Sequence, residues 1–368
     1  MKFSIQREAL LKPLQTIVGV VERRQTLPVL SNILMVVTSD RLSMTATDLE
    51  VEMIASLPVI NAEPGDITIP ARKIVDICRA LPDGVEIHIA LDAEKQRVTV
   101  RSGKSRFNLT TLPITDFPSN DEITSQFEFS LPQNVLKHLI EKSSFAMAQQ
   151  DVRYYLNGLL LEISKGVVRA VATDGHRLAM CSHDCEVNPA DTLQIIVPRK
   201  GVGELVKLLD DSDDPVQIQV SNNHIKIKLN DFIFTSKLID GRFPDYERVI
   251  PKNSDKHIEA QRELLRHALL RTSILSNEKY RGIRLRLSNN LIQAQANNPE
   301  MEEAEEEIEV NYTGGDLEIG FNVSYFLDAL ATISENTVAI ELGDANSSCV
   351  IRPKEDSNCT YVIMPMRL

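Results

Sequence analysis

The sequence repeats itself at a fixed spacing, and this repeat limits the folds that the chain can adopt. The Ala-Thr-Asp triplet at residues 46–48 returns at residues 172–174, and Phe117-Pro118 returns as Phe243-Pro244, each 126 positions later. Two further matches at this spacing are residues 10–12 with 136–138 and residues 32–34 with 158–160. Several matches at one spacing indicate a duplicated structural unit.

A weaker third copy follows. Residues 264–270 resemble the helical segments that contain Leu10 and Leu136. A chain of 368 residues also exceeds the usual size of one hydrophobic core. We therefore expect three units, at residues 1–125, 126–252 and 253–368. Within each unit, two amphipathic helices and alternating strands predict an α+β fold, with two helices packed on antiparallel sheet.

Composition and the N-terminus favour a cytoplasmic globular protein. Hydrophobic residues make up 43% and charged residues 25% of the chain, as in ordinary globular proteins. No apolar run approaches the ~18 residues of a membrane helix. The N-terminus lacks the apolar segment of a signal peptide, so we expect the cytoplasm as the location.

Charge is distributed unevenly between the units. The formal net charge is −12, with −2, −2 and −8 in the three units. Acidic residues of the third unit gather at Glu300, Glu302, Glu303, Glu305, Glu306, Glu307 and Glu309, and basic residues of the first unit at Lys95, Arg97, Arg101, Lys104 and Arg106. Either run alone is typical of a solvated face. Together they favour a head-to-tail contact between two chains, which closes into a ring or grows into a filament.

The negative net charge, taken alone, argues weakly against nucleic-acid binding.

The sequence lacks the common catalytic motifs. It contains no glycine-rich phosphate loop, nucleophile elbow or zinc-protease motif. The most enzyme-like segment holds Asp174 and His176, which resemble an acid–base pair. No nucleophile is spaced to complete a triad, so a turn histidine or a pocket histidine is favoured over a hydrolase.

The five cysteines are odd in number and irregularly spaced, which argues against a framework of disulfides. Cys181 and Cys185, with His183 between them, resemble half of a metal site, but no second pair lies at zinc spacing. We therefore expect ordinary thiols, no metal and no cofactor.

Two segments favour binding. In Arg153-Tyr154-Tyr155 a basic residue precedes two aromatic residues. This pattern is typical of a strand edge or of contact with nucleic acid or a peptide. The chain end, residues 361–368, is unusually apolar, and Met364 and Met366 flank Pro365. Because methionine suits adaptable surfaces, we expect a packed or partner-binding tail.

Five longer segments, residues 150–158, 171–178, 232–238, 240–246 and 364–368, closely resemble the sliding clamp family, the beta subunit of bacterial DNA polymerase III. The resemblance runs end to end and is greatest to gammaproteobacterial members. It implies a head-to-tail homodimeric ring of clamp domains around double-stranded DNA, which makes the replicative polymerase processive and catalyses nothing itself. Partners would dock linear motifs in a pocket between the second and third domains: the polymerase III alpha subunit, the clamp loader delta subunit, translesion polymerases, mismatch repair proteins and ligase.

The resemblance also implies particular residues. The peptide pocket would contain Arg153, Leu156, Thr173, Gly175, His176, Arg177, Leu178, Pro244, Arg248, Val249, Asn322, Tyr325, Ser348, Val362, Met364, Pro365 and Met366. Near the DNA it implies Arg24, Gln150, Tyr154 and Tyr155. The dimer interface would contain Phe107, Leu109, Ile274 and Leu275, together with Arg97, Arg106, Glu300, Glu302, Glu303 and Glu306 of the charged runs. Glu247 departs from the basic residue expected at the pocket rim, which leaves the rim charge open.

A ring around DNA also calls for basic residues on inward helices. The candidates are Lys12, Arg72, Lys73, Lys137, Arg199, Lys200, Arg266 and Arg271. So few phosphate contacts predict weak, salt-sensitive binding, with retention on DNA by topology. A hydrolase and a filament protein remain the alternatives, and a discrete dimer near twice 41.2 kDa would favour the ring.

Overall fold

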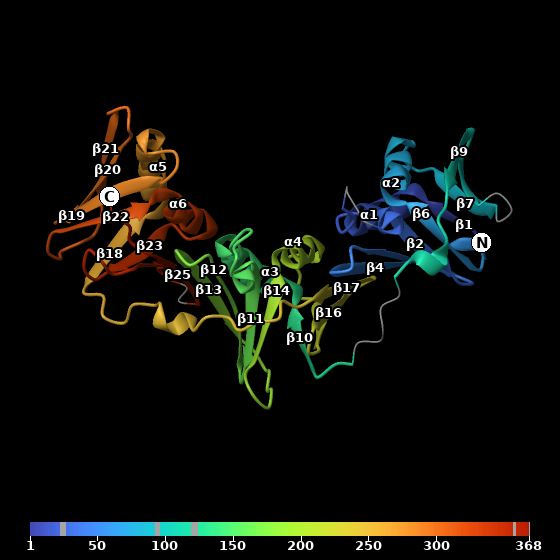
Figure 1. The fold of residues 1–368 in the computed structure, drawn as a ribbon, viewed down its shortest axis with the longest axis horizontal. Helices are drawn as coiled ribbons and strands as arrows, with labels where there is room; N and C mark the ends of the chain where they lie inside the picture. Colours follow the sequence, from blue (N-terminus) through green and yellow to red (C-terminus); the bar gives the residue numbers. More distant parts are fainter. Residues whose placement is uncertain (23–26, 93–95, 119–123, 356–357, 368) are drawn as a thin grey trace. The chain divides into compact units, whose positions relative to one another are not determined.

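The computed structural model describes residues 1–22, 27–92, 96–118, 124–355 and 358–367 (Figure 1). The elements follow one order three times: a strand, a helix, several strands, a second helix and three strands. The first repeat contains β1 (Lys2–Gln6), α1 (Arg7–Ile17), β2 (Asn32–Val37), β3 (Arg41–Thr47), β4 (Val51–Pro58), β5 (Ile60–Glu63), β6 (Gly65–Pro70), α2 (Ala71–Ala80), β7 (Glu86–Asp92), β8 (Arg97–Ser102) and β9 (Ser105–Thr110).

The second repeat contains β10 (Phe127–Pro132), α3 (Gln133–Ser143), β11 (Gly158–Ser164), β12 (Val167–Thr173), β13 (Arg177–Asp184), β14 (Leu193–Pro198), α4 (Arg199–Leu208), β15 (Pro215–Val220), β16 (His224–Leu229) and β17 (Phe232–Lys237). The third contains β18 (Lys256–Gln261), α5 (Arg262–Thr272), β19 (Gly282–Ser288), β20 (Leu291–Asn297), β21 (Glu303–Glu309), β22 (Leu317–Asn322), α6 (Val323–Thr332), β23 (Thr337–Leu342), β24 (Cys349–Pro353) and β25 (Cys359–Ile363). Helices α1 and α3 begin at residues 7 and 133, so the 126-residue spacing of the sequence is confirmed as a spacing of elements.

The helices form where the apolar positions recur at helical spacing. In α1 the buried side chains include Leu10, Leu14 and Ile17, which lie on one face of the helix. Helix α1 packs beside α2, and α5 packs beside α6 (Figure 1). The expected α+β fold, with pairs of helices packed on antiparallel sheet, is confirmed.

Two eight-stranded sheets each combine strands of two consecutive repeats. In one, the order is β10-β15-β16-β17-β4-β3-β2-β6, and β17 pairs with β4. In the other, the order is β14-β11-β12-β13-β25-β24-β23-β18, and β13 pairs with β25. The last strand of a repeat therefore pairs with the fourth strand of the repeat before it. We call these two strand pairs the joints.

The remaining strands form two smaller sheets, ordered β5-β1-β7-β8-β9 and β21-β20-β19-β22. Residues divide into two compact units, 1–134 with 200–238 and 135–199 with 239–368, and each unit contains one joint. The division into domains at residues 125 and 252 stays a prediction. Among the described helices, none is long and apolar enough to cross a membrane.

The cysteines differ from the expectation. Cys181 on β13 and Cys359 on β25 are register partners and form a disulfide. Cys185 is a free thiol, as are Cys78 and Cys349. The prediction of ordinary thiols was therefore wrong for Cys181, because the joint brings it against a cysteine that lies 178 residues away in the sequence.

Candidate functional site

The second joint holds the chain end in place. Leu178 of β13 lies opposite Val362 of β25, and both side chains are buried. Beyond β25, the backbone N–H of Met364 donates to the carbonyl of His176 at 2.9 Å. The N–H of Met366 donates to the carbonyl of Gly320, also at 2.9 Å. The apolar tail is thus hydrogen-bonded to the rest of the chain at Met364 and Met366.

The Thr173-Asp174 turn precedes β13 and is built from side-chain hydrogen bonds to the backbone. Oδ1 of Asp174 accepts from the backbone N–H groups of His176, at 2.9 Å, and Arg177, at 3.0 Å. The hydroxyl of Thr173 accepts from the N–H of Gly175 and donates to the carbonyl of Arg177. Since Asp174 contacts the backbone of His176, these contacts favour the turn interpretation over an acid–base pair.

The first repeat contains the same turn. Oδ1 of Asp48 accepts from the N–H groups of Glu50, at 2.9 Å, and Val51, at 2.7 Å. The hydroxyl of Thr47 accepts from the N–H of Leu49, as that of Thr173 does from Gly175. The repeated Thr-Asp pair is therefore a structural motif: in both copies its side chains form the same hydrogen bonds to the backbone of the turn.

Gly175 lets a basic side chain approach the turn. Its φ is +86°, and a Cβ at this position would lie 2.8 Å from the guanidinium of Arg153. That guanidinium bonds both carboxylate oxygens of Asp151 and the carbonyl of Asp174. The hydrogen bonds from Arg153 lower the pKa of Asp151 to about 2. Arg153 nevertheless keeps a side chain that is 46% exposed, at the rim of the turn.

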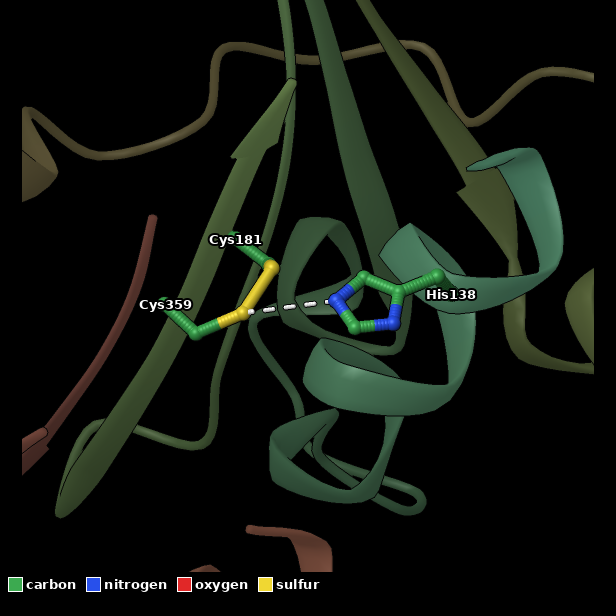
Figure 2. A group of neighbouring side chains, drawn as sticks. All are labelled: His138, Cys181 and Cys359. Carbon is green, nitrogen blue, oxygen red and sulfur yellow. Dashed lines mark hydrogen bonds between the residues drawn. A yellow bond between two sulfur atoms is a disulfide. The ribbon is translucent and has the colours of Figure 1, made fainter. Parts of the chain in front are cut away.

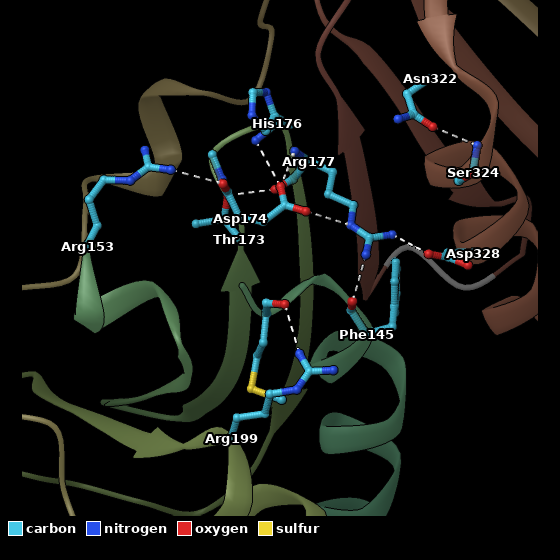
Figure 3. Close-up of polar contacts among 12 residues, drawn as sticks. Phe145, Arg153, Thr173, Asp174, His176, Arg177, Arg199, Asn322, Ser324 and Asp328 are labelled. Carbon is cyan, nitrogen blue, oxygen red and sulfur yellow. Dashed lines mark hydrogen bonds and ion pairs between the residues drawn. The ribbon is translucent and has the colours of Figure 1, made fainter. Parts of the chain in front are cut away.

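Arg177 connects the turn to helix α6 and to Phe145, which lies just after helix α3 (Figure 3). Its guanidinium pairs with Asp174 at 3.1 Å and with Asp328 of α6, and it donates to the carbonyl of Phe145 at 2.9 Å. It also lies 4.8 Å from the ring centre of Tyr325, and the same ring stacks against His176. Only 13% of the Arg177 side chain is exposed, so its main contacts are within the chain.

A buried network anchors the segment that carries Pro244, Arg248 and Val249. The hydroxyl of Tyr246 donates to Glu162 at 2.9 Å, and Arg169 pairs with the same carboxylate at 2.8 Å. Burial alone would raise the pKa of Glu162, but the hydrogen bonds it accepts outweigh burial and lower that pKa. Burial, together with the adjacent Glu162 charge, raises the pKa of the Tyr246 phenol. The phenol therefore stays protonated and acts as a donor.

The predicted pocket residues all lie in the unit formed by residues 135–199 and 239–368. Leu156, Leu178 and Val362 are buried, and Val249 packs on the apolar cluster that contains Leu178 and Val362. Thr173, Gly175, Arg177, Val249, Asn322, Tyr325, Ser348, Met364, Pro365 and Met366 are partly exposed, and Arg153, His176, Pro244 and Arg248 are exposed. Asn322 caps α6 by accepting from the N–H of Ser324. Glu247 is exposed beside Arg248, which pairs with Asp245.

The predicted DNA-contacting residues are divided between the two units. Arg72 and Lys200 lie in one unit, and Gln150, Tyr154, Tyr155 and Arg199 lie in the other. Arg24 lies outside the described residues. Tyr154 is 58% exposed, and Arg72 and Arg199 are exposed while each donates one hydrogen bond to a backbone carbonyl, of Val21 and Met147.

Lys200 is less available than the sequence suggested. Its ammonium pairs with Asp48 and, at 2.7 Å, with Glu22. Burial lowers the pKa of Lys200, but the hydrogen bonds that its ammonium donates to the carboxylates of Asp48 and Glu22 outweigh burial and raise the pKa. The charge is therefore retained and largely balanced within the chain.

Most of the predicted interface residues lie on or next to two edge strands, β9 and β21. Arg97, Arg106, Phe107 and Leu109 lie on β8 and β9, and Glu303 and Glu306 lie on β21, with Glu300 and Glu302 just before it; Lys95 lies outside the described residues. Ile274, beside Leu275, is 73% exposed. Glu306 already pairs with Arg271 at 2.6 Å within its own chain.

Several residues of the site carried no signal in the sequence. Phe145, Gly320 and Asp328 hold Arg177 and the tail, yet none of them lies in a recognisable motif. Their roles arise from contacts between elements that are far apart in the chain.

Three family models match consecutive parts of the chain: the N-terminal domain of the DNA polymerase III beta subunit at residues 1–121, the central domain at 130–245 and the C-terminal domain at 247–367. The chain belongs to the DNA polymerase III beta subunit family, the sliding clamps. Its function is that of a sliding clamp, a processivity subunit without catalytic activity.

Relatives and solved structures agree over the whole length. The chain is 57% identical to the beta sliding clamp of Pseudomonas aeruginosa and 53% identical to that of Escherichia coli, with 100% of both chains covered in each case. A crystal structure of the Pseudomonas aeruginosa sliding clamp with ligand superposes with a TM-score of 0.97 at 56% identity, over 100% of both chains. The Caulobacter crescentus beta sliding clamp superposes with a TM-score of 0.95 at 38% identity, over 100% of this chain and 99% of that one.

We predict that Arg177→Ala destabilises the fold by about 2–4 kcal/mol, because it leaves the mostly buried Asp174 and the half-exposed Asp328 without their shared cation. Denaturant unfolding followed by circular dichroism measures this loss. Arg153→Ala is the matched control: its ion pair with Asp151 is exposed, so a much smaller loss is expected. Equal losses in the two variants would contradict the assignment of Arg177 as the connecting residue.

Proposed function

We propose that two copies of this clamp close head to tail into a ring around duplex DNA, and that β9 of one chain pairs with β21 of the other. In both joints the last strand of a repeat pairs with the fourth strand of the preceding repeat. By that rule β9 lacks a preceding repeat and β21 lacks a following one. Within the described residues, β9 pairs only with β8, and β21 only with β20.

Sheet order supports this pairing. Joining β9 to β21 of a second chain would give the order β1-β7-β8-β9-β21-β20-β19-β22. Element by element, this matches the two complete sheets, β10-β15-β16-β17-β4-β3-β2-β6 and β18-β23-β24-β25-β13-β12-β11-β14. An unpaired strand edge exposes a row of backbone donors and acceptors, so two complementary edges favour association.

The joints also suggest a register. Phe107, Phe234 and Tyr361 occupy the same place in β9, β17 and β25, each 127 residues after the last. Phe234 lies opposite Met53, and Tyr361 lies opposite Ala179. The equivalent residue of β21 is Ala304, which pairs with Ala296 as Ala179 pairs with Ala172.

Phe107 would therefore lie opposite Ala304 of the second chain, and its neighbours follow in order. Arg106 would lie opposite Glu305, and Asn108 opposite Glu303. Arg106 against Glu305 gives opposite charges on facing strands, which stabilises a cross-strand pair. The exposed Ile274 would supply apolar contact area to the same interface.

Retention on DNA would come from the closed ring. The net charge of −12 disfavours nonspecific attraction to DNA, and the few basic residues on helices would make weak, salt-sensitive phosphate contacts without sequence preference. Lys137 of α3 and Arg266 of α5 occupy equivalent places in their repeats. We further propose three domains with boundaries near residues 125 and 252, and a cytoplasmic location.

Partners would bind at the second joint. Met364, Pro365 and Met366 would form one side of the site, with Val249 and Pro244 opposite and the buried Leu178 beneath. An extended peptide with leucine or phenylalanine near its end would bury those side chains there. The polymerase III alpha subunit, the clamp loader delta subunit and repair proteins with such motifs are the proposed ligands.

The ring itself is tested with circular DNA. We predict that clamp loaded onto nicked circular duplex stays bound at moderate salt and is released when one cut linearises the circle. Gel filtration of the DNA fraction before and after the cut measures this. Clamp that stays on linear duplex independently of salt would contradict topological retention.

The interface is tested with Ile274→Ala combined with Leu275→Ala. Loss of two large side chains at a buried interface costs on the order of 2–5 kcal/mol each, so we predict monomers of 41.2 kDa at micromolar concentration in place of dimers. Sedimentation velocity measures the mass. Ile60→Ala with Leu264→Ala, two similarly exposed residues outside the proposed interface, is the control and is expected to remain dimeric.

Cysteine pairs check the register of the same interface. Asn108→Cys with Glu303→Cys is expected to give covalent dimers on mild oxidation, because these positions would face each other between chains. Asn108→Cys with Glu307→Cys, four residues out of register, is expected to give few. A reversed yield, or higher oligomers in place of dimers, would contradict this register or favour a filament.

Deletion of residues 364–368 is predicted to weaken binding of a polymerase alpha-subunit peptide at least tenfold, about 1.4 kcal/mol. The deletion removes the tail but leaves β25, which ends at Ile363, paired with β13. Fluorescence anisotropy measures the affinity, and sedimentation checks that the dimer persists. Met301→Ala, a methionine that is 90% exposed elsewhere, is expected to bind normally; an unchanged affinity in the deletion would place the site elsewhere.

A further inference from the structure

We propose that His138, Cys181 and Cys359 form a binding site for a soft divalent cation such as Zn²⁺ when the two cysteines are reduced. The three ligand atoms all lie within 4.8 Å of one another (Figure 2). Nε2 of His138 is 3.9 Å from Sγ of Cys359. Two sulfurs and one imidazole nitrogen within such a distance are a ligand set that zinc prefers.

The fold brings the three residues together from separate elements. Cys181 and Cys359 face each other across the second joint, with their Cα atoms 4.1 Å apart. His138 comes from α3, and Figure 2 shows its ring turned toward the two sulfurs. The site therefore connects a helix to both strands of the joint.

Burial and charge favour a metal in the reduced state. Cys181 and Cys359 are 0% and 1% exposed. Two thiolates placed so close in an apolar interior would repel each other and lack solvation. A divalent cation cancels both charges, and a neutral imidazole completes a site with no net charge. His138 is exposed, so water can reach the cation as a fourth ligand.

The disulfide is the metal-free form of the same site. Its sulfurs share a bond and carry no thiolate charge, so they do not bind a cation in this way. A small dithiol reductant would transfer two electrons and two protons to the disulfide, giving two thiols and its own cyclic disulfide. Zinc binding would then release one proton from each thiol to solvent. A reducing compartment favours the dithiol form.

The test uses the full-length chain, reduced and freed of reductant without air. Zinc sulfate is added in competition with a chromophoric chelator, and one zinc ion per chain is expected. Cys181→Ser, Cys359→Ser and His138→Ala should each bind zinc at least tenfold more weakly. Cys349→Ser, which removes another buried free thiol, should bind as the parent does.

A second measurement uses only the unmodified chain, so it does not depend on the folding of variants. Oxidation with diamide should abolish zinc binding, and reduction should restore it. With Co²⁺ in place of zinc, the reduced chain should show a thiolate-to-metal charge-transfer band. The proposal is overturned if the reduced chain binds no zinc at micromolar concentration, if the oxidised chain binds it equally, or if Cys181→Ser binds it unchanged.

Discussion

Strand pairing between consecutive repeats is the interaction on which the rest of this structure depends. A single repeat leaves its last strand and its fourth strand with unpaired backbone groups, which are costly to leave without partners and prone to association. The chain satisfies them at β4 with β17 and at β13 with β25. Both joints follow one rule, and the same rule indicates which strand each of the two remaining edges requires. We propose that a second copy of the chain supplies these strands.

The second joint also creates the surface proposed for partners. Leu178 and Val362 face each other in the ladder, and the tail leaves the end of β25 to bond with His176 and Gly320. The pairing of β25 with β13 fixes where Ile363 lies, and Met364 follows it directly. The position of the tail therefore depends on strand register rather than on its own sequence. A peptide that binds there would read a surface assembled from two repeats, which neither repeat presents alone.

Two sets of polar contacts fasten helices to this joint. Arg177 ties the start of β13 to Asp328 on α6, and His138 extends from α3 to the paired cysteines. Both are charge- or redox-sensitive contacts, unlike the apolar core beneath them. Cys181 and Cys359 lie on β13 and β25, the strands beneath the proposed partner surface. If the reduced cysteines bind zinc, a change in their oxidation state would alter the contacts of these two strands.

Local patterns were enough to predict the amphipathic helices and the turn at Gly175, because each depends on residues close together in the chain. Matches at one fixed spacing were enough to reveal the repeat. The family resemblance added the clamp function and a list of residues. Tertiary structure alone decided how the charged groups are used: Lys200 is balanced by Asp48 and Glu22, and Glu306 by Arg271. Arg177 meets Asp328 across 151 residues, and Cys181 meets Cys359 across 178. Such partners are fixed by which strands pair, and strand pairing depends on the whole chain, so no local pattern reveals them.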